Sequence, residues 1–305
     1  MIQKLDKGAL ASKDEVRGLL APAPALDPAL LRSEQVKLPG ALGALKVLRP
    51  AAAPYVNVDP QAPAVVLVPG LGTDGMAWLR QLPLGALADL HAPQHPHLPA
   101  PGEAGLGHFA RYVEAYVEAR KLHERPGGVV LMGMSMGGAV CLNVASRGRI
   151  PIRGLALLGT FGHRRHLSWF DRNFARYLVR VLPPPLVRWA ATFAVRRTKL
   201  FAKFEGDEGQ FMVHGINVAS RGYLVRAVSA ITTQEQLEAA RALKVPTFVA
   251  HGRSDFVLPH AAAEELARTI PGAKLVSVDG GGHAFFFTHH ETVNESLARW
   301  LAELA

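Results

Sequence analysis

A five-residue turn, Gly133-Met134-Ser135-Met136-Gly137, constrains the fold of this chain more than any other stretch of its sequence. The all-apolar residues 129–132 before it are typical of a buried parallel strand, and residues 139–145 after it predict a packed helix. A strand that becomes a helix within so few residues leaves no room for side chains beside the pivot. The two glycines supply that room, so Ser135 is predicted to present its hydroxyl at the tip of the turn.

Two later segments place a polar side chain after a predicted strand. One strand leads through a short turn to Asp255, and the last strand leads through a glycine turn to His283. Parallel strands of an α/β sheet have their carboxyl ends at one edge, so Ser135, Asp255 and His283 are expected to meet there. Asp279 is a competing acid, but it lies within the last strand beside His283, and Asp255 is therefore preferred.

The G-x-S-x-G turn and the order Ser…Asp…His resemble the α/β-hydrolase superfamily over about residues 64–302, and within it the serine esterases and lipases. The resemblance implies an α/β fold with a mostly parallel, doubly wound sheet and a helical cap, or lid, inserted into it. It also implies a catalytic triad, with Ser135 as nucleophile, His283 as general base and Asp255 as the residue that orients the histidine.

An oxyanion hole is implied by the same resemblance. Residues 64–72 predict a buried strand that ends in a glycine-rich turn, where the superfamily usually carries a His-Gly-x sequence; here Pro69 replaces the histidine. Because proline lacks only its own N–H, the amide of Leu71 remains available as a donor. The amide of Met136, at the start of the helix after the nucleophile, is the expected second donor.

The sequence divides into three predicted parts: an N-terminal extension packing on the core (residues 1–60), an α/β-hydrolase core (61–160 and 231–305) and a helical cap (161–230). Within the extension, residues 36–48 predict a hairpin that turns at Pro39-Gly40.

Three histidines raise the question of a metal site. Residues 76–90 predict a helix interrupted at Pro83, and the proline-rich stretch after it, with His91, His95 and His97, predicts a surface loop. The prolines between the histidines and the lack of a nearby carboxylate or thiolate argue against a metal. We therefore expect none here.

All of the net charge of +9 lies in residues 161–203, which hold ten Lys and Arg residues against one acidic residue. Arginines there alternate with apolar side chains on two predicted helices, the first capped by Ser168 and Asp171. We expect Trp169 and Phe170 to contact the substrate, together with Met134 beside the nucleophile.

Two interpretations of this segment stay open. In the first, the aromatic residues pack on the core and the arginines are simply solvated. In the second, the cationic face attracts an anionic lipid surface or an anionic substrate such as an acyl-CoA. Nucleic-acid binding is not expected, since no recognition motif accompanies the charge.

The single cysteine, Cys141, excludes an internal disulfide and suits a reducing compartment, and its place on the helix after the turn favours a buried structural thiol. The first twenty residues lack the apolar run of a secretory signal, and no stretch is long and apolar enough to span a bilayer. We therefore expect a cytoplasmic protein without a transmembrane segment.

These features predict hydrolysis of a small carboxylic ester with an apolar acyl chain, through an acyl-enzyme intermediate. The alternatives among enzymes are an acyl-CoA thioesterase, whose substrate phosphates suit the arginines, and a carbon-carbon bond hydrolase or a cofactor-free relative. A non-catalytic hydrolase-like protein that binds an apolar ligand or a membrane is the alternative of another class. No metal, nucleotide or redox cofactor is expected.

Overall fold

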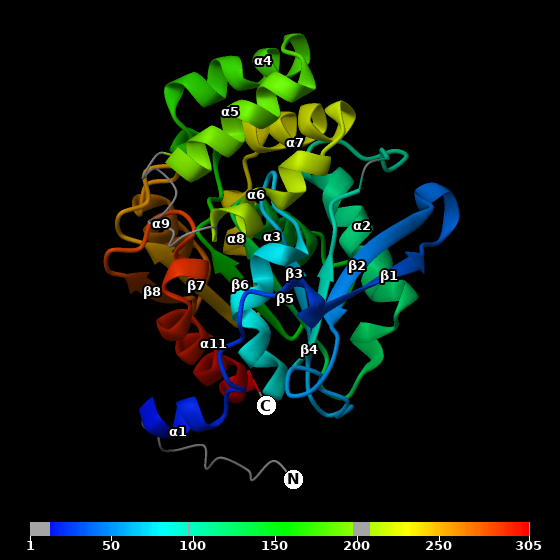
Figure 1. Cartoon of the computed structure of the whole chain (residues 1–305), viewed down its shortest axis with the longest axis vertical. Coiled ribbons are helices and arrows are strands. Elements are labelled where there is room, and N and C mark those ends of the chain that lie inside the picture. The colour runs from blue at the N-terminus through cyan, green and yellow to red at the C-terminus, as the bar shows by residue number, and fades with distance from the viewer. Residues whose placement is uncertain (1–12, 97, 198–207, 305) are drawn as a thin grey trace.

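An eight-stranded sheet runs through the molecule in the order β1-β2-β4-β3-β5-β6-β7-β8 (Figure 1). The computed structural model describes residues 13–96, 98–197 and 208–304. Strands β3 to β8 pair in parallel, whereas β1 and β2 pair antiparallel with each other and β2 pairs antiparallel with β4. The predicted α/β fold with a mostly parallel sheet is confirmed. The strands are β1 (Leu31–Lys37), β2 (Ala44–Pro50), β3 (Ala64–Val68), β4 (Asp89–Pro93), β5 (Val129–Met134), β6 (Gly154–Leu158), β7 (Thr247–Gly252) and β8 (Lys274–Val278).

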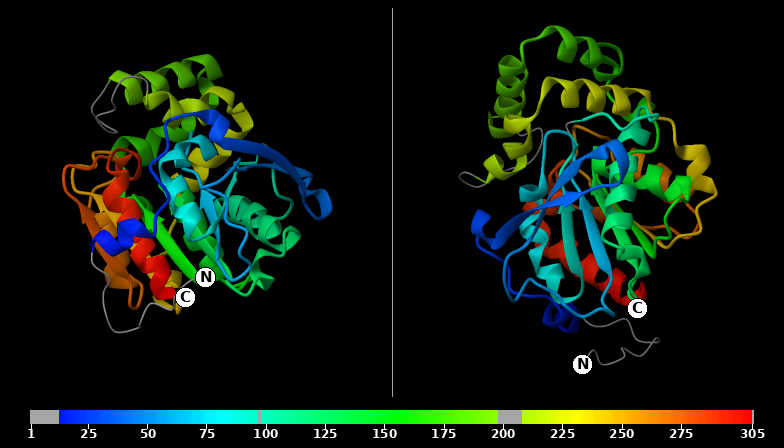
Figure 2. Two further views of the ribbon diagram at one scale, coloured as in Figure 1. Left: turned by 60° about the horizontal axis from the view of Figure 1, so that its bottom comes forward. Right: turned by 90° about the vertical axis from the view of Figure 1, so that its right-hand side faces the viewer.

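Helices cover both faces of this sheet (Figure 2). One group that packs together comprises η3 (Gly75–Ala86), α10 (Phe285–Thr288) and α11 (His290–Leu304), with α1 (Lys13–Gly18) against α11. A second group comprises α2 (Leu106–Ala119), α3 (Met136–Arg147), α8 (Leu237–Arg241) and α9 (Ala261–Thr269). Short helical turns join some of the elements: η1 (Pro28–Leu30), η2 (Gly40–Leu42), η4 (Leu122–Glu124) and η5 (Arg164–His166).

Burial of the central strands on both faces explains why their sequences are continuous apolar runs and do not alternate between apolar and polar residues. Every residue of β3, β5, β6 and β7 is buried, because helices cover both sides of a parallel sheet. Cys141 on α3 is completely buried as well, and burial raises the pKa of its thiol. Within the described residues, no helix combines the length and the apolar character that crossing a bilayer requires.

The predicted hairpin in the N-terminal region is present, and it is longer than the sequence indicated. β1 and β2 pair from Leu31 with Pro50 to Lys37 with Ala44. We expected residues 1–60 to form an extension packed on the core, and residues 31–50 instead add two strands to the sheet itself. Residues 1–12 of the predicted extension lie outside the described residues.

The predictions for residues 76–90 and for the following loop need correction. The helix is a 3₁₀ helix, η3, that ends at Ala86, and the next residues form the buried strand β4. The polar residues of β4 concealed it, because each finds a partner far away in the sequence. Asp89 is paired with Arg49 and Arg125, and His91 bonds through Nδ1 to the Tyr116 hydroxyl at 2.7 Å.

Five helices lie together above one end of the sheet (Figure 1): η6 (Asp171–Ala175), α4 (Arg176–Val181), α5 (Pro184–Arg197), α6 (Gly209–Val218) and α7 (Arg221–Thr233). We call them the cap helices. The predicted capping pair is present, since the Asp171 amide donates to Ser168 Oγ at 3.0 Å and that hydroxyl donates to Asp171 Oδ2 at 2.7 Å. Residues 198–207 of the predicted cap lie outside the described residues, and the division of the chain at residues 60, 160 and 230 remains a proposal.

The turn after β5 gives a prediction about stability. A Cβ atom added to Gly137 would stand 2.1 Å from the Val68 carbonyl oxygen, so β3 and α3 would have to separate. We expect Gly137→Ala to lower the free energy of unfolding by at least about 2 kcal/mol, measured by urea denaturation.

Gly18→Ala is the matched control, because nothing lies within 4 Å of the added methyl group there. The control should change the free energy of unfolding by less than about 1 kcal/mol. Equal denaturation midpoints for the two variants would show that the close approach at Gly137 does not constrain the fold.

Candidate active site

Ser135 occupies a strained position at the tip of the turn between β5 and α3. Its φ and ψ angles are 52° and −121°, a conformation that residues with a side chain rarely adopt. Backbone contacts fix it there: the Ser135 amide donates to the Leu158 carbonyl at 2.9 Å, and the Thr160 hydroxyl donates to the Ser135 carbonyl at 2.6 Å. The turn therefore holds the Ser135 hydroxyl at the carboxyl edge of the sheet.

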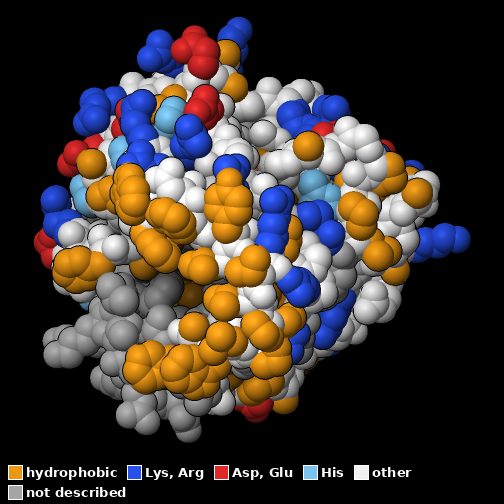
Figure 3. Space-filling view, turned by 90° about the horizontal axis from the view of Figure 1, so that it is seen from above, with side chains coloured by type: hydrophobic (Ala, Val, Ile, Leu, Met, Phe, Trp, Pro, Cys, Tyr) orange, Lys and Arg blue, Asp and Glu red, His pale blue; other side chains and the backbone are white. Residues whose placement is uncertain are grey.

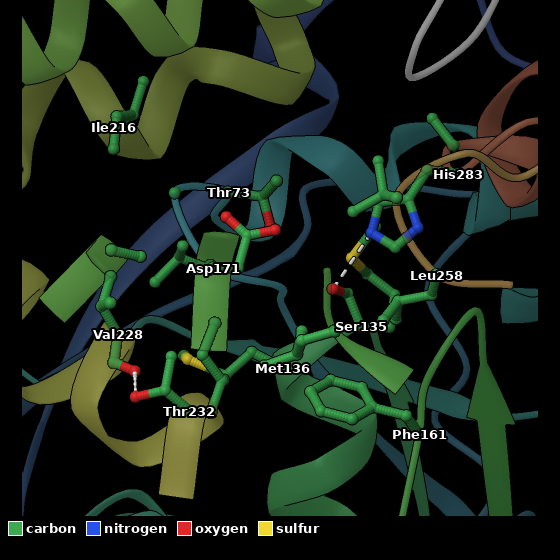
Figure 4. Close-up of a pocket in the computed structure, with 18 of the residues that line it drawn as sticks. Thr73, Ser135, Met136, Phe161, Asp171, Ile216, Val228, Thr232, Leu258 and His283 are labelled. Atoms are coloured by element: carbon green, nitrogen blue, oxygen red, sulfur yellow. Dashed lines mark hydrogen bonds between the residues drawn. The ribbon is translucent and has the colours of Figure 1, made fainter. Parts of the chain in front are cut away.

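The three side chains that the sequence predicts to meet do lie together. His283 Nε2 is 3.0 Å from Ser135 Oγ (Figure 4). On the other side of the ring, His283 Nδ1 is 2.8 Å from Asp255 Oδ2. Because a carboxylate only accepts hydrogen bonds, Nδ1 carries the ring proton, and Nε2 is left to accept the proton of the Ser135 hydroxyl. This is the arrangement in which a histidine can remove a proton from serine.

Asp255 is held by four donors. Its Oδ1 accepts from the amides of Val257 at 2.8 Å and Leu258 at 3.0 Å, while its Oδ2 faces both His283 and the Nε2 of His251, which lies 3.1 Å away. His251 Nε2 is also 3.0 Å from the Leu258 carbonyl, which can only accept, so this nitrogen carries a proton. A second histidine thus donates to the same carboxylate oxygen that His283 contacts.

These contacts decide the charge of Asp255. Burial alone would raise the pKa of its carboxyl, but the neighbouring charge of His283 and the hydrogen bonds from His251, His283 and the Leu258 amide lower the pKa well below its usual range. Asp255 is therefore a carboxylate at neutral pH. The competing acid, Asp279, points away: it is 91% exposed and pairs with Arg253 at 2.8 Å.

The two residues predicted to supply an oxyanion hole line the same cavity as Ser135. Leu71 and Met136 both line the cavity next to Ser135, and neither amide donates to another described residue. The Gly72 amide is already engaged, since it donates to the Tyr223 hydroxyl at 3.3 Å. The prediction that the Leu71 and Met136 amides would donate to an oxyanion is compatible with these positions and stays a prediction.

His95, for which the sequence predicted a surface loop, instead holds the turn that precedes Leu71. His95 Nε2 donates to the carbonyl oxygens of Pro69 at 2.8 Å and Gly70 at 3.2 Å. Its ring stacks on Tyr223, with centroids 5.5 Å apart, and meets the edge of Phe109. Desolvation in these surroundings lowers the pKa of His95 to about 4, so the ring is neutral at neutral pH.

A largely apolar cavity of about 260 Å³ lies between the Ser135 hydroxyl and the cap helices. Met134 lines it from the core, as predicted, and Met212, Ile216 and Val228 line it from the cap (Figure 4). Asp171 is the one carboxylate among its described lining residues. The shape and composition suit an apolar chain attached to a group that reaches Ser135.

Trp169 and Phe170, which the sequence analysis assigned to the substrate, do not line this cavity and are corrected. Both are exposed, and Asp171 and Ala175 from the same segment face the cavity instead. The physical reason is that neighbouring helical residues point in different directions: with Asp171 and Ala175 turned to the cavity, Trp169 and Phe170 just before them point elsewhere.

The histidines considered as metal ligands point to different partners. His91 contacts Asp89 and Tyr116, His95 contacts the loop at Pro69, and His97 lies outside the described residues. In the part of the chain that the structure describes, no three His, Cys, Asp or Glu side chains form a group suited to a metal.

The low pKa of His95 predicts acid sensitivity. An unfolded histidine titrates near pH 6.5, whereas folded His95 titrates near 4, so between these values only the unfolded chain takes up the proton and acid favours unfolding. Lowering the pH from about 6.5 to about 4.5 should remove about 2 kcal/mol of stability through this group alone.

His95→Gln isolates this contribution, because glutamine has no titrating ring and the similarly low pKa of His108, about 4, remains in both proteins. We expect the free energy of unfolding of the variant, from urea denaturation, to fall less over the same pH range. Parallel pH profiles for the two proteins would contradict a neutral His95.

Comparison with known proteins places the chain in a family. The sequence profile described as the alpha/beta hydrolase family matches residues 65–296. Polyketide synthase ThaQ of Burkholderia thailandensis is 27% identical over 320 residues, which cover 97% of this chain but only 14% of that protein. A pimeloyl-(acyl-carrier protein) methyl ester esterase of Aromatoleum aromaticum is 28% identical over 247 residues, covering 75% of this chain and 94% of the esterase.

The fold is shared with solved structures. A thermophilic esterase from Thermogutta terrifontis superposes with a TM-score of 0.69 at 20% identity, over 90% of this chain and 99% of the esterase. The match to the family profile covers most of the sequence and includes Ser135, Asp255 and His283. The chain therefore belongs to the alpha/beta hydrolase family.

Proposed function

We propose that this hydrolase-family protein cleaves carboxylic esters with an apolar acyl chain, using Ser135 as nucleophile. The observation that carries the proposal is the 3.0 Å contact between Ser135 Oγ and His283 Nε2 at the floor of an apolar cavity. The contact leaves the hydroxyl beside a base and within reach of a carbonyl carbon that enters the cavity.

The first half of the reaction forms an acyl-enzyme. Ser135 Oγ attacks the ester carbonyl carbon while its proton passes to His283 Nε2. The negative charge that develops on the carbonyl oxygen is stabilised by the Leu71 and Met136 amides. Collapse of the tetrahedral intermediate breaks the bond to the alkoxy oxygen, which leaves as the alcohol with the proton from His283.

The second half releases the acid. Water attacks the acyl carbon and gives a proton to His283, and the resulting intermediate expels Ser135 Oγ, which regains that proton. Asp255, ionised throughout, stabilises the imidazolium formed in both halves. His251 keeps the carboxylate in place through its contact with Oδ2.

A thioester is the second candidate substrate, because the arginines of the cap helices could contact the phosphates of a coenzyme or carrier arm. Two relatives, a polyketide synthase and an esterase of an acyl-carrier-protein methyl ester, support the same substrate class. Side-by-side rates on p-nitrophenyl and coenzyme A derivatives of the same acid distinguish the two substrate classes.

Ser135→Ala should lower kcat on short p-nitrophenyl esters by at least about 10⁴-fold, because no other group supplies the nucleophile. Ser33→Ala, at an exposed serine on β1, is the matched control and should retain full activity. A fluorophosphonate probe should label the unaltered protein at Ser135. Undiminished turnover by the purified Ser135→Ala variant would remove Ser135 from its role as nucleophile. No turnover and no label on the folded, unaltered protein would favour a non-catalytic binding protein.

The carboxylate of Asp171 predicts selectivity against acids. Since it is the charged cap residue in an apolar cavity, it should repel an acyl chain that ends in a carboxylate. Asp171→Asn is expected to raise kcat/KM for the p-nitrophenyl monoester of a dicarboxylic acid roughly tenfold relative to the neutral ester of similar length.

Glu238→Gln removes a carboxylate that is 89% exposed on α8, and it serves as the control for the change in net charge. This control should leave the ratio of the two kcat/KM values unchanged. The same ratio in Asp171→Asn as in the unaltered protein would show that Asp171 does not select the acyl chain.

A further inference from the structure

On η6, α4 and α5, four arginines whose side chains the structure describes stand without a carboxylate partner among the described residues: Arg172, Arg176, Arg180 and Arg188. The contacts they do make are to neutral groups. Arg176 lies over the Tyr177 ring, 4.9 Å from its centroid, and Arg188 donates to the Ala219 carbonyl at 2.6 Å. In contrast, Arg165 next to the core is paired with Glu265. Part of the excess positive charge of the protein thus stands on η6, α4 and α5 with no compensating carboxylate among the described residues.

These helices and the two residues before η6 expose most of the large apolar side chains at the described surface. Trp169, which with Phe170 directly precedes η6, is 65% exposed, and Trp189 on α5 is 64% exposed. The others, on η6, α4 and α5, are Phe174, Tyr177, Val181, Leu186 and Phe193. The rings contact one another rather than the core, as Trp189 stacks on Phe193 with centroids 5.5 Å apart. The interpretation in which these aromatic residues pack on the core is therefore wrong.

Figure 3, which views the molecule from the cap side, shows apolar side chains gathered in patches with Lys and Arg side chains beside them. We call the eight apolar residues and four arginines named above the cap surface. A surface that combines exposed Trp, Phe and Tyr with unpaired arginines has the composition of protein segments that lie in the interface between lipid headgroups and acyl chains.

We propose that the cap surface docks on an anionic lipid bilayer. The aromatic rings would enter the headgroup region, where their apolar bodies leave water, and the arginines would contact lipid phosphates. The proposal does not depend on the reaction at Ser135, since none of the residues of the cap surface lines the catalytic cavity.

A lipid surface fits better than a second copy of the chain. Two copies meeting through this face would bring two sets of four unpaired arginines together, and that repulsion opposes association. A bilayer that contains anionic lipid supplies both an apolar medium and a negative charge density, so it matches both parts of the cap surface.

The tryptophans provide a direct reporter. Of the four in the sequence, Trp78 and Trp300 are buried in the core, whereas Trp169 and Trp189 are on the cap surface. Vesicles of phosphatidylcholine mixed with phosphatidylglycerol should shift the emission of the protein to shorter wavelength, and phospholipids brominated in the acyl chain should quench it. Vesicles of phosphatidylcholine alone should bind much more weakly, and binding should weaken as NaCl rises from about 0.05 M to about 0.5 M.

Cosedimentation of variants with the mixed vesicles separates the two contributions. Arg176→Gln with Arg180→Gln should lower the partition coefficient about 25-fold, about fivefold for each charge removed. Arg32→Gln with Lys37→Gln, at exposed positions on β1, removes the same charge elsewhere and should change it less than about twofold. Trp169→Ala with Trp189→Ala should reduce partitioning at least about tenfold, whereas Val58→Ala, at a residue 86% exposed away from the cap surface, should not.

Three results would overturn the proposal. The first is the absence of binding to the mixed vesicles at low salt, and the second is equal loss of binding in the β1 control. The third is a stable dimer in sedimentation whose tryptophan emission is already shifted without lipid, which would assign the cap surface to a second copy. Binding that persists in Ser135→Ala shows that docking and turnover are separate properties.

Discussion

The approach of three backbone segments at the turn after β5 is the constraint on which the rest of the site depends. β3 and α3 come so close at Gly137 that a single methyl group would overlap the Val68 carbonyl, and the same crowding holds Ser135 at a positive φ. Because the sheet is parallel, its other carboxyl ends lie at the same edge, and Asp255 and His283 need only short turns to reach the serine. The packing of the whole central sheet thus keeps Ser135 in its strained backbone conformation.

Charged side chains at the active site and on the cap helices differ in whether they have partners. At the site, Asp255 receives donors from two histidines and two amides, so its negative charge is compensated within the core. On the cap helices, positive charge is left without carboxylate partners, and the apolar rings beside it face outward. The paired carboxylate of Asp255 suits a fixed reaction geometry. The unpaired arginines at the surface favour binding to a negatively charged partner.

The sequence was a good guide wherever a residue's position follows from its neighbours in the chain. The apolar runs of the buried strands and the glycine turn gave the core fold, and Ser135, Asp255 and His283 could be expected to meet because each follows a strand. Local sequence patterns did not predict the roles of residues whose contacts are far away in the sequence. Nothing near His95 or His251 indicates that one supports the loop at Pro69 and the other the carboxylate of Asp255.

Other misses have equally specific causes. β4 was taken for helix and loop since its polar residues find their partners 25 to 40 residues away in the sequence, and no local period reveals a buried ion pair. Trp169 and Phe170 were expected to contact the substrate, but Asp171 and Ala175, four positions apart, line the cavity from this segment.

The hydrogen bond from the Gly72 amide to the Tyr223 hydroxyl joins a loop of the core to a cap helix. Gly72 is covalently next to Leu71, whose amide is one of the two proposed donors to the developing oxygen charge, and the Tyr223 ring also stacks on His95 beneath the same loop. Any shift of α7 relative to the sheet must therefore either break this bond or carry the Leu71 amide with it. A displacement of the cap helices would thus be transmitted, through this one hydrogen bond, to an amide that is proposed to stabilise the transition state.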